Sequence, residues 1–291
     1  MNYITGTPGL QPRAVPVRSL TGARRHPALI LFLSGMTGNV RQWREVTDRL
    51  MDVPADLAFG TPVVPGVIFG RAVPTLADVA TAIANHLGSD PEGGEIIIVS
   101  HSVGSFSALG IAHEIPAVVK SVILVNGGLA GVGRFLDRPV REFAAQPLRC
   151  LAFLRLFALV SAPAPQWLKR ALASRRWLTR AVLGGLVSAS ATRTREIRAA
   201  VLNEAGGPWV LASLWRNRHH WREFAAYAGQ IRTDALFIVG DADPISAEKD
   251  ADEMASMLPG ATVRVLRGVG HAAPLEVPDV IADAVREALK A

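Results

Sequence analysis

Short, almost wholly apolar runs of five or six residues alternate with longer stretches of mixed polarity along most of the chain. Such runs are typical of strands that are buried on both faces of a parallel sheet. The stretches between them space apolar residues three and four apart, or consist of small residues, which favours helices packed on that sheet. The predicted strands are residues 28–33, 95–99, 121–125, 235–239 and 262–266, and the predicted helices are residues 40–51, 76–87, 103–112, 247–258 and 280–289. A proline-broken segment, residues 61–69, is a further candidate strand.

The alternation of strand and helix stops after residue 133 and resumes at residue 233. Strands that alternate with helices form a mostly parallel sheet with crossover helices on its faces. The segment between is rich in leucine, alanine, arginine and tryptophan and predicts several helices. We therefore expect an α/β fold with a mostly parallel central sheet, built from residues 1–133 and 233–291. Residues 134–232 are expected to form a helical cap inserted into it.

The composition narrows the class of protein. Of the 291 residues, 49% are hydrophobic, which supplies a sizeable core and excludes a disordered chain. The single cysteine excludes an internal disulfide and any metal site built from cysteines. No uncharged apolar stretch reaches the roughly 18 residues that a membrane span needs. The first residues also lack the basic head and apolar run of a secretory signal. We therefore expect a soluble, cytoplasmic protein.

The charge of the chain is concentrated in the predicted cap. The net charge is +6, but residues 134–232 contain 17 basic and 5 acidic residues, while the rest of the chain has 14 basic and 20 acidic residues. A segment of that sign attracts anions or anionic surfaces. A solvated, arginine-rich face with no function explains the same numbers, and both interpretations stay open at this point.

Candidate catalytic residues follow the end of the predicted strand 95–99. The chain there continues as Ser100-His101-Ser102-Val103-Gly104 and runs into a helix of small residues. A serine on a sharp turn between strand and helix is held clear of the backbone, and its neighbours must be small to allow the bend. The amide after it lies at a helix N-terminus, where the free N–H groups favour an anion.

An acidic residue and a histidine follow two later strands. Two aspartates, Asp241 and Asp243, lie in the turn after strand 235–239, and His271 ends a Gly-Val-Gly-His loop after strand 262–266. The carboxyl ends of parallel strands meet at one edge of a sheet, where ligands and reacting groups collect. The serine, the acid and the histidine therefore converge on one edge if the sheet is parallel.

This arrangement resembles the α/β-hydrolase family. That family carries its nucleophile in a G-x-S-x-G turn, here with Ser100 in place of the first glycine, and orders its triad along the chain as serine, acid, histidine. The resemblance implies that Ser102 is the nucleophile, His271 the base and Asp243 the acid that orients it. Asp241 is the alternative acid, although a turn or capping role suits it better.

The resemblance also implies an oxyanion hole made of two backbone amides. One is the N–H of Val103, and the family draws the other from the loop after its first core strand, here the N–H of Met36. The alternative for that loop is a simple glycine turn before a helix. No metal and no organic cofactor is implied.

Two other features have ordinary explanations. The glycine cluster of residues 127–133 lacks the third glycine of the G-x-G-x-x-G dinucleotide fingerprint, and we interpret it as the link into the insertion. His101 is expected to pack against the sheet. The pair His219 and His220 is expected to pack within the cap rather than bind a metal.

The function expected from these residues is that of a serine hydrolase, specifically a carboxylesterase or thioesterase that works through an acyl-enzyme. Several apolar cap residues are expected to line the acyl pocket, and others to pack only the core of the cap: Leu151, Phe153, Leu154, Phe157, Trp167, Trp177, Trp209, Trp215 and Trp221. With the arginine excess, these suggest a hydrophobic acyl group that bears, or is attached to, an anion. The expected partners are a small-molecule acyl substrate and an acidic carrier protein or an anionic lipid surface, but not a nucleic acid; the oligomeric state stays open.

Other functions remain open because a fold does not fix a function. The same fold and triad support hydrolases of carbon–carbon bonds, hydroxynitrile lyases and haloperoxidases that use no cofactor. A non-catalytic protein that binds a small molecule is the alternative from a different class.

Overall fold

A computed structural model describes residues 2–4, 15–17, 28–36, 40–60, 75–88, 94–161, 165–183 and 209–291 of the chain. Its centre is a six-stranded sheet in the order β4-β3-β5-β6-β7-β8, in which every neighbouring pair is parallel. The strands are β3 (Ala28–Leu33), β4 (Ala55–Gly60), β5 (Glu95–His101), β6 (Val119–Val125), β7 (Asp234–Gly240) and β8 (Ala261–Leu266). Two short antiparallel strands, β1 (Asn2–Ile4) and β2 (Val15–Val17), precede them.

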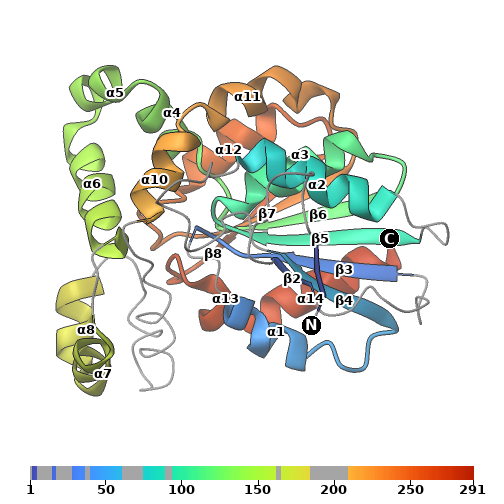
Figure 1. The fold of residues 1–291 in the computed structure, drawn as a ribbon, viewed down its shortest axis with the longest axis horizontal. Helices are drawn as coiled ribbons and strands as arrows, with labels where there is room; N and C mark the ends of the chain where they lie inside the picture. Colours follow the sequence, from blue (N-terminus) through green and yellow to red (C-terminus); the bar gives the residue numbers. More distant parts are fainter. Residues whose placement is uncertain are drawn as a thin grey trace.

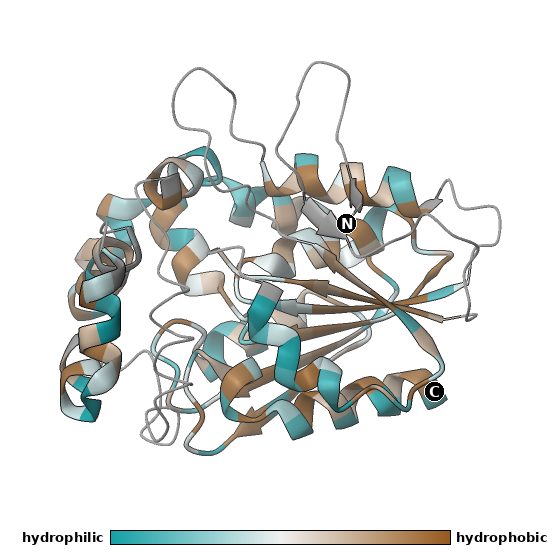
Figure 2. Ribbon diagram, turned by 60° about the horizontal axis from the view of Figure 1, so that its bottom comes forward, coloured by the Kyte–Doolittle hydropathy of each residue, from teal (hydrophilic) through white to brown (hydrophobic). Residues whose placement is uncertain are grey.

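Helices cover both faces of the sheet (Figure 1). One face carries α2 (Leu76–Gly88), α3 (Gly104–Glu114) and α12 (Glu248–Ser256); the other carries the 3-10 turn η1 (Val40–Trp43), α1 (Arg44–Asp48), α13 (Ala273–Glu276) and α14 (Pro278–Lys290). Alternate residues of each strand enter the two cores: in β3, Leu29 and Leu31 face the first, and Ile30 and Phe32 face the second. Figure 2 shows the strands as apolar along most of their length, as burial on both faces requires.

The cap segment lies between β6 and β7, and its described residues form helices joined by short links. Its helices are α4 (Ala130–Asp137), α5 (Pro139–Ala145), α6 (Pro147–Ser161), α7 (Gln166–Ser174), α8 (Arg176–Leu183), α10 (Trp209–Arg216), α11 (His220–Tyr227) and the 3-10 turn η2 (Ala228–Gln230). The division into core and cap stays a prediction. Within the described residues, no helix combines the length and the apolar character needed to cross a membrane.

The predicted α/β fold and its five strands are confirmed, but the short strands β1 and β2 and one strand of the central sheet, β4, were missed. The edge strand β4 is only partly buried, and its sequence, ADLAFG, contains an aspartate and two small alanines. It therefore lacks the continuous apolar run by which the buried strands are identified. The candidate strand at residues 61–69 lies outside the described residues.

Candidate active site

Ser102 lies on the turn that joins β5 to α3. Its φ of 52° is in the left-handed region, which a serine adopts only where the surrounding structure imposes it. Its N–H donates to the carbonyl oxygen of Val125 at the end of β6 (3.1 Å). A Cβ on Gly104 would lie 2.6 Å from the Ser34 carbonyl oxygen. The helix can therefore approach the first strand this closely only with glycine at that position.

Ser100, which replaces the first glycine of the family turn, is accommodated by a polar partner. Its side chain is fully buried. Its hydroxyl shares a hydrogen bond of 3.1 Å with the hydroxyl of Ser105, the second residue of α3. The departure from glycine therefore leaves the shape of the turn intact.

His271 lies between Ser102 and Asp243. Its Nε2 is 3.0 Å from the Ser102 Oγ, and its Nδ1 is 2.7 Å from the Asp243 Oδ2. An ionised carboxylate only accepts hydrogen bonds, so the proton of a neutral imidazole belongs on Nδ1 and the lone pair of Nε2 faces the serine hydroxyl. The structure thus brings together the three side chains that the sequence predicts as a triad.

The Asp243 carboxylate is fixed by the turn that follows it. The residue is 4% exposed, and its Oδ1 accepts hydrogen bonds from the backbone amides of Ile245 (2.8 Å) and Ser246 (3.2 Å). The alternative acid, Asp241, points elsewhere: its Oδ1 accepts from the amide of Gly268 at 2.6 Å. Asp241 therefore holds the start of the histidine loop, in the turn role expected for it, and does not contact His271.

The loop after β3 lies against the serine. A Cβ added to Gly35 would be 3.2 Å from the Cβ of Ser102, so Met36 follows a residue that is in contact with the turn. Val103 directly precedes α3 and is buried. Within the described residues, the amide nitrogens of Met36 and Val103 make no hydrogen bond. The loop that carries Met36 therefore lies against the turn that carries Ser102, and the role of the two amides as oxyanion donors stays a prediction.

His101 contacts the backbone of the histidine loop. It is buried, and its Nε2–H donates to the carbonyl oxygen of His271 at 2.7 Å. Burial lowers the pKa of His101 to about 3, so this imidazole is neutral at physiological pH. Packing was expected for His101, but the contact with the backbone of His271 was not. It joins residues 170 positions apart, and no local pattern signals it.

Asn126 joins the acid loop to the histidine loop and was missed in the sequence. It is fully buried and has a φ of 46°. Its Oδ1 accepts from the amide of Gly240 (3.1 Å), and its Nδ2 donates to the carbonyl oxygen of Gly270 (2.7 Å). The available signal was its position: a polar residue directly after the buried strand β6, at the same sheet edge as the other site residues.

The cap arginines nearest the core are occupied by carboxylates. Arg149 of α6 makes a bidentate ion pair with Asp250 of α12, whose side chain is 1% exposed. Arg134 of α4 pairs with Glu253 of the same helix. These two guanidinium groups hold the cap to the core and are not free to bind a substrate anion.

The cap histidines also have structural partners. His219 contacts the carboxylate of Asp137 at 2.8 Å. His220 is buried, and its Nδ1–H donates to the carbonyl oxygen of Asn217. Burial lowers the pKa of His220 to about 4. Within the described residues, no cluster of three histidine, cysteine, aspartate or glutamate side chains is arranged to hold a metal ion.

The apolar cap residues expected to line a pocket divide into two groups. Phe153 and Phe157 are buried in the core cluster, and Trp221 packs against it. Five others are exposed among the described residues: Leu151, Leu154, Trp167, Trp177 and Trp215. The side chain of Trp209 lies outside the described residues. The amphipathic pattern identified helices correctly but did not reveal which of their faces meets solvent.

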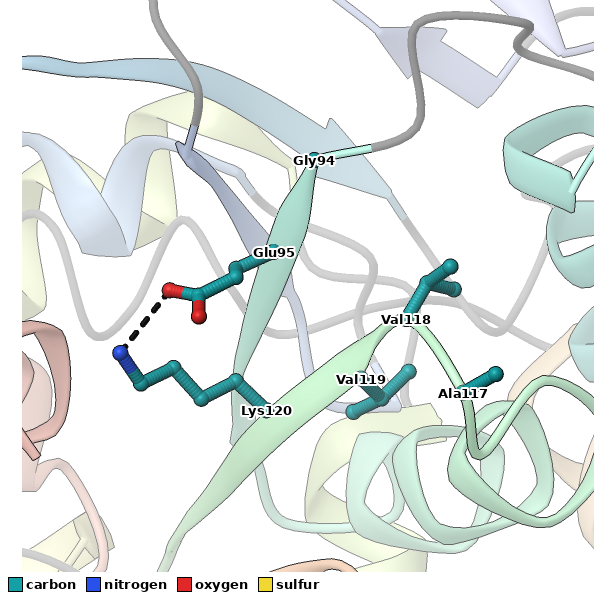
Figure 3. Close-up of a pocket in the computed structure, with 6 residues that line it drawn as sticks. All are labelled: Gly94, Glu95, Ala117, Val118, Val119 and Lys120. Carbon is teal, nitrogen blue, oxygen red and sulfur yellow. Dashed lines mark hydrogen bonds and ion pairs between the residues drawn. The ribbon is translucent and has the colours of Figure 1, made fainter.

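A small hollow of about 240 Å³ lies at the opposite end of the strands (Figure 3). The residues that line it lie where β5 and β6 begin, whereas Ser102 follows the end of β5. Its two charged residues, Lys120 and Glu95, pair with each other at 2.8 Å. The hollow is therefore separate from the candidate active site and offers no unpaired charge to a ligand.

Comparisons with known proteins place these features in a family. The model of the alpha/beta hydrolase family matches residues 30–284. No protein of curated function matches the chain in sequence.

Among solved structures, an esterase from Thermogutta terrifontis superposes with a TM-score of 0.58 at 18% identity, covering 95% of this chain and 97% of that one. A 2-hydroxy-6-oxo-6-phenylhexa-2,4-dienoate hydrolase from a Rhodococcus species gives a TM-score of 0.58 at 18% identity, with coverage of 93% and 92%. A hydrolase from Oleispira antarctica gives a TM-score of 0.63 at 15% identity, with coverage of 90% and 91%. At these identities the likeness is one of fold.

Proposed function

This chain belongs to the alpha/beta hydrolase family, and from that premise we propose that it is a serine hydrolase that cleaves a carboxylic ester or thioester through an acyl-enzyme. The observation that carries the proposal is the position of His271, with one ring nitrogen 3.0 Å from the hydroxyl of Ser102 and the other 2.7 Å from the carboxylate of Asp243. Distances of this size are those over which a nucleophile, a base and an orienting acid exchange protons.

The reaction begins at Ser102. His271 Nε2 takes the hydroxyl proton while Oγ forms a bond to the carbonyl carbon of the substrate. The carbonyl oxygen becomes an oxyanion, which the amides of Met36 and Val103 stabilise. Asp243 keeps the imidazole oriented and stabilises its positive charge. When the tetrahedral intermediate collapses, the alcohol or thiol leaves with the proton from His271.

Water completes the cycle. His271 takes a proton from a water molecule, whose oxygen attacks the acyl carbon of the ester formed on Ser102. A second oxyanion forms in the same place. Its collapse breaks the bond to Oγ, which recovers its proton from His271, and a carboxylic acid is released.

For the substrate, we propose a hydrophobic acyl group that bears an anionic group or is attached to one. The support is the net positive charge of residues 134–232, reduced by the two arginines that α12 already neutralises. Cleavage of an anionic ester should then fall steeply with added salt, because salt screens the attraction. Cleavage of a neutral short ester should change little, and an equal response of both substrates would remove the charge argument.

The function is tested with p-nitrophenyl esters and acyl thioesters of increasing chain length. Ser102→Ala and His271→Ala should each lower kcat on the order of 10⁴-fold or more, as in other triads. Ser256→Ala is the matched control, because that serine is exposed on α12 and its hydroxyl donates to the carbonyl oxygen of Glu253 in the same helix. Ester cleavage by Ser102→Ala at the rate of the unsubstituted protein would reject the proposal.

Activity in a parallel assay for a vinylogous diketone, or with halide and peroxide, would redirect the assignment if esters and thioesters were not cleaved. Each of these reactions belongs to one of the alternatives that the same fold supports.

A further inference from the structure

The α7–α8 hairpin hides its small side chains and exposes its largest ones. The two helices are α7 (Gln166–Ser174) and α8 (Arg176–Leu183), joined at Arg175. Ala173 and Thr179 are 2% and 0% exposed, whereas Trp167 and Trp177 are 69% and 67% exposed. A helix that packs only on its own protein shows the reverse arrangement, with its large apolar side chains buried.

The inner contacts of the hairpin fix this orientation. The Thr179 hydroxyl donates to the carbonyl oxygen of Leu172 at 2.8 Å, which ties α8 to α7. Arg155 of α6 donates to the carbonyl oxygen of Ala181 at 3.4 Å. The faces with Thr179 and Ala173 are therefore inside, and the faces with the tryptophans point outward. Figure 1 shows the hairpin at the end of α6, at the edge of the molecule away from the sheet.

The sequence segment that contains the two tryptophans carries charge of a single sign. Between Glu142 and Glu196 the sequence contains no acidic residue, and apart from Arg149, which pairs with Asp250 of α12, it contains eight basic ones: Arg155, Lys169, Arg170, Arg175, Arg176, Arg180, Arg193 and Arg195. On the hairpin, Arg170 and Arg180 are exposed. Each follows a tryptophan by three residues, a spacing that places both side chains on one helix face. Each outer face of the hairpin therefore carries a tryptophan next to an arginine.

We propose that the α7–α8 hairpin binds the surface of an anionic lipid bilayer. Indole rings prefer the headgroup level of a membrane, where one part of the ring is in contact with apolar chains and the other with water. Arginines beside them reach lipid phosphates with their guanidinium groups while their stems lie along the apolar layer. Helices with these two features lie in the plane of the interface without crossing it.

The charge pattern favours a bilayer over a protein partner. Protein interfaces arrange positive and negative groups to complement those of one partner. A segment that contains eight basic residues besides Arg149, and no acidic residue, instead suits a surface whose charge is negative everywhere. The inference does not rest on the proposed hydrolysis, because none of the hairpin residues belongs to the catalytic machinery.

Vesicle flotation tests the inference with the full-length Ser102→Ala protein, so that turnover of lipid does not interfere. We expect the protein to float with vesicles of phosphatidylglycerol and phosphatidylcholine in equal parts, and not with phosphatidylcholine alone. Trp167→Ala with Trp177→Ala should weaken binding at least about tenfold. Arg170→Glu with Arg180→Glu should also weaken it at least about tenfold, since each cation near the surface contributes about fivefold.

Trp215→Ala is the matched control. Trp215 is 71% exposed but lies on α10, outside the hairpin, so its replacement should leave binding unchanged. Far-UV circular dichroism checks that all variants fold, as expected for exposed positions. The proposal is overturned if the protein floats with neither type of vesicle or equally with both. It is also overturned if the hairpin variants bind like the unsubstituted protein, or if Trp215→Ala loses as much binding as they do.

Discussion

Replacing Asn126 measures how far the candidate active site depends on the link between its acid loop and its histidine loop. The side chain is fully buried and joins the amide of Gly240 to the carbonyl oxygen of Gly270. Asn126→Gly keeps the backbone freedom that a φ of 46° requires but removes both hydrogen bonds. Asn126→Ala removes both bonds and adds the steric penalty of the left-handed conformation.

The expected magnitude follows from these contacts. Each backbone group that is left buried without a partner costs about 1–3 kcal/mol, so Asn126→Gly should lower the free energy of unfolding by about 2–6 kcal/mol. Asn126→Ala should cost about 1 kcal/mol more, from the left-handed strain. Both variants loosen the loops that carry Asp243 and His271. A displacement of about 1 Å at such a site lowers catalysis about 100-fold, so kcat should fall far more than KM changes.

Urea unfolding and ester hydrolysis on the same samples are the assays, and Asn217 supplies the matched control. Asn217 is also buried, accepts from the amide of Leu76 at 2.7 Å and donates to the carbonyl oxygen of Ser213 at 2.9 Å. Asn217→Ala should therefore lower stability but leave kcat near its original value. Wild-type stability and kcat in Asn126→Gly would refute the reasoning, and so would an equal loss of kcat in Asn217→Ala.

Two further predictions concern charge. His101 and His220 are buried with pKa values lowered to about 3 and about 4 from 6.5, so as the pH falls from 6.5 the unfolded chain gains protons that the folded chain does not. The free energy of unfolding should then fall by about 1 kcal/mol per pH unit for each histidine, down to pH 4 for His220. In urea unfolding at a series of pH values, the free energy of unfolding of His220→Gln should fall less steeply with decreasing pH. An unchanged pH dependence in this variant would contradict the prediction. Asp250→Ala should destabilise the protein by about 3–5 kcal/mol, because Arg149 loses its buried partner. The double variant Arg149→Met with Asp250→Leu should lose less, and an equal or larger loss would show that the pair itself stabilises the fold.

Much of the fold could be predicted because most of its strands can be recognised from their local sequence. The runs at β3, β5, β6 and β7 are apolar on both faces, so no knowledge of their neighbours is needed to recognise them. The edge strand β4 needs only partial burial, and its mixed sequence gives no comparable signal. The positions of Ser102, Asp243 and His271 could be predicted for a related reason. Each follows a buried strand, and parallel strands bring their carboxyl ends together.

The rest depends on contacts between distant residues. His101 meets the backbone of His271, and Asn126 meets Gly270, across 170 and 144 positions. The sequence near His101 and Asn126 does not indicate these distant partners. Likewise, the sequence indicates that Trp167 and Trp177 belong to amphipathic helices, but only the packing of Thr179 decides that the tryptophans face outward.

Covalent labelling of Ser102 tests the central claim most directly. A fluorophosphonate forms a stable bond only with a serine that a neighbouring base activates, so peptide mass spectrometry after labelling locates the nucleophile. We predict one adduct, on Ser102, which is lost in His271→Ala and strongly slowed in Asp243→Asn. Ester cleavage without any adduct on Ser102, or labelling of Ser102 at an undiminished rate in His271→Ala, would contradict the account.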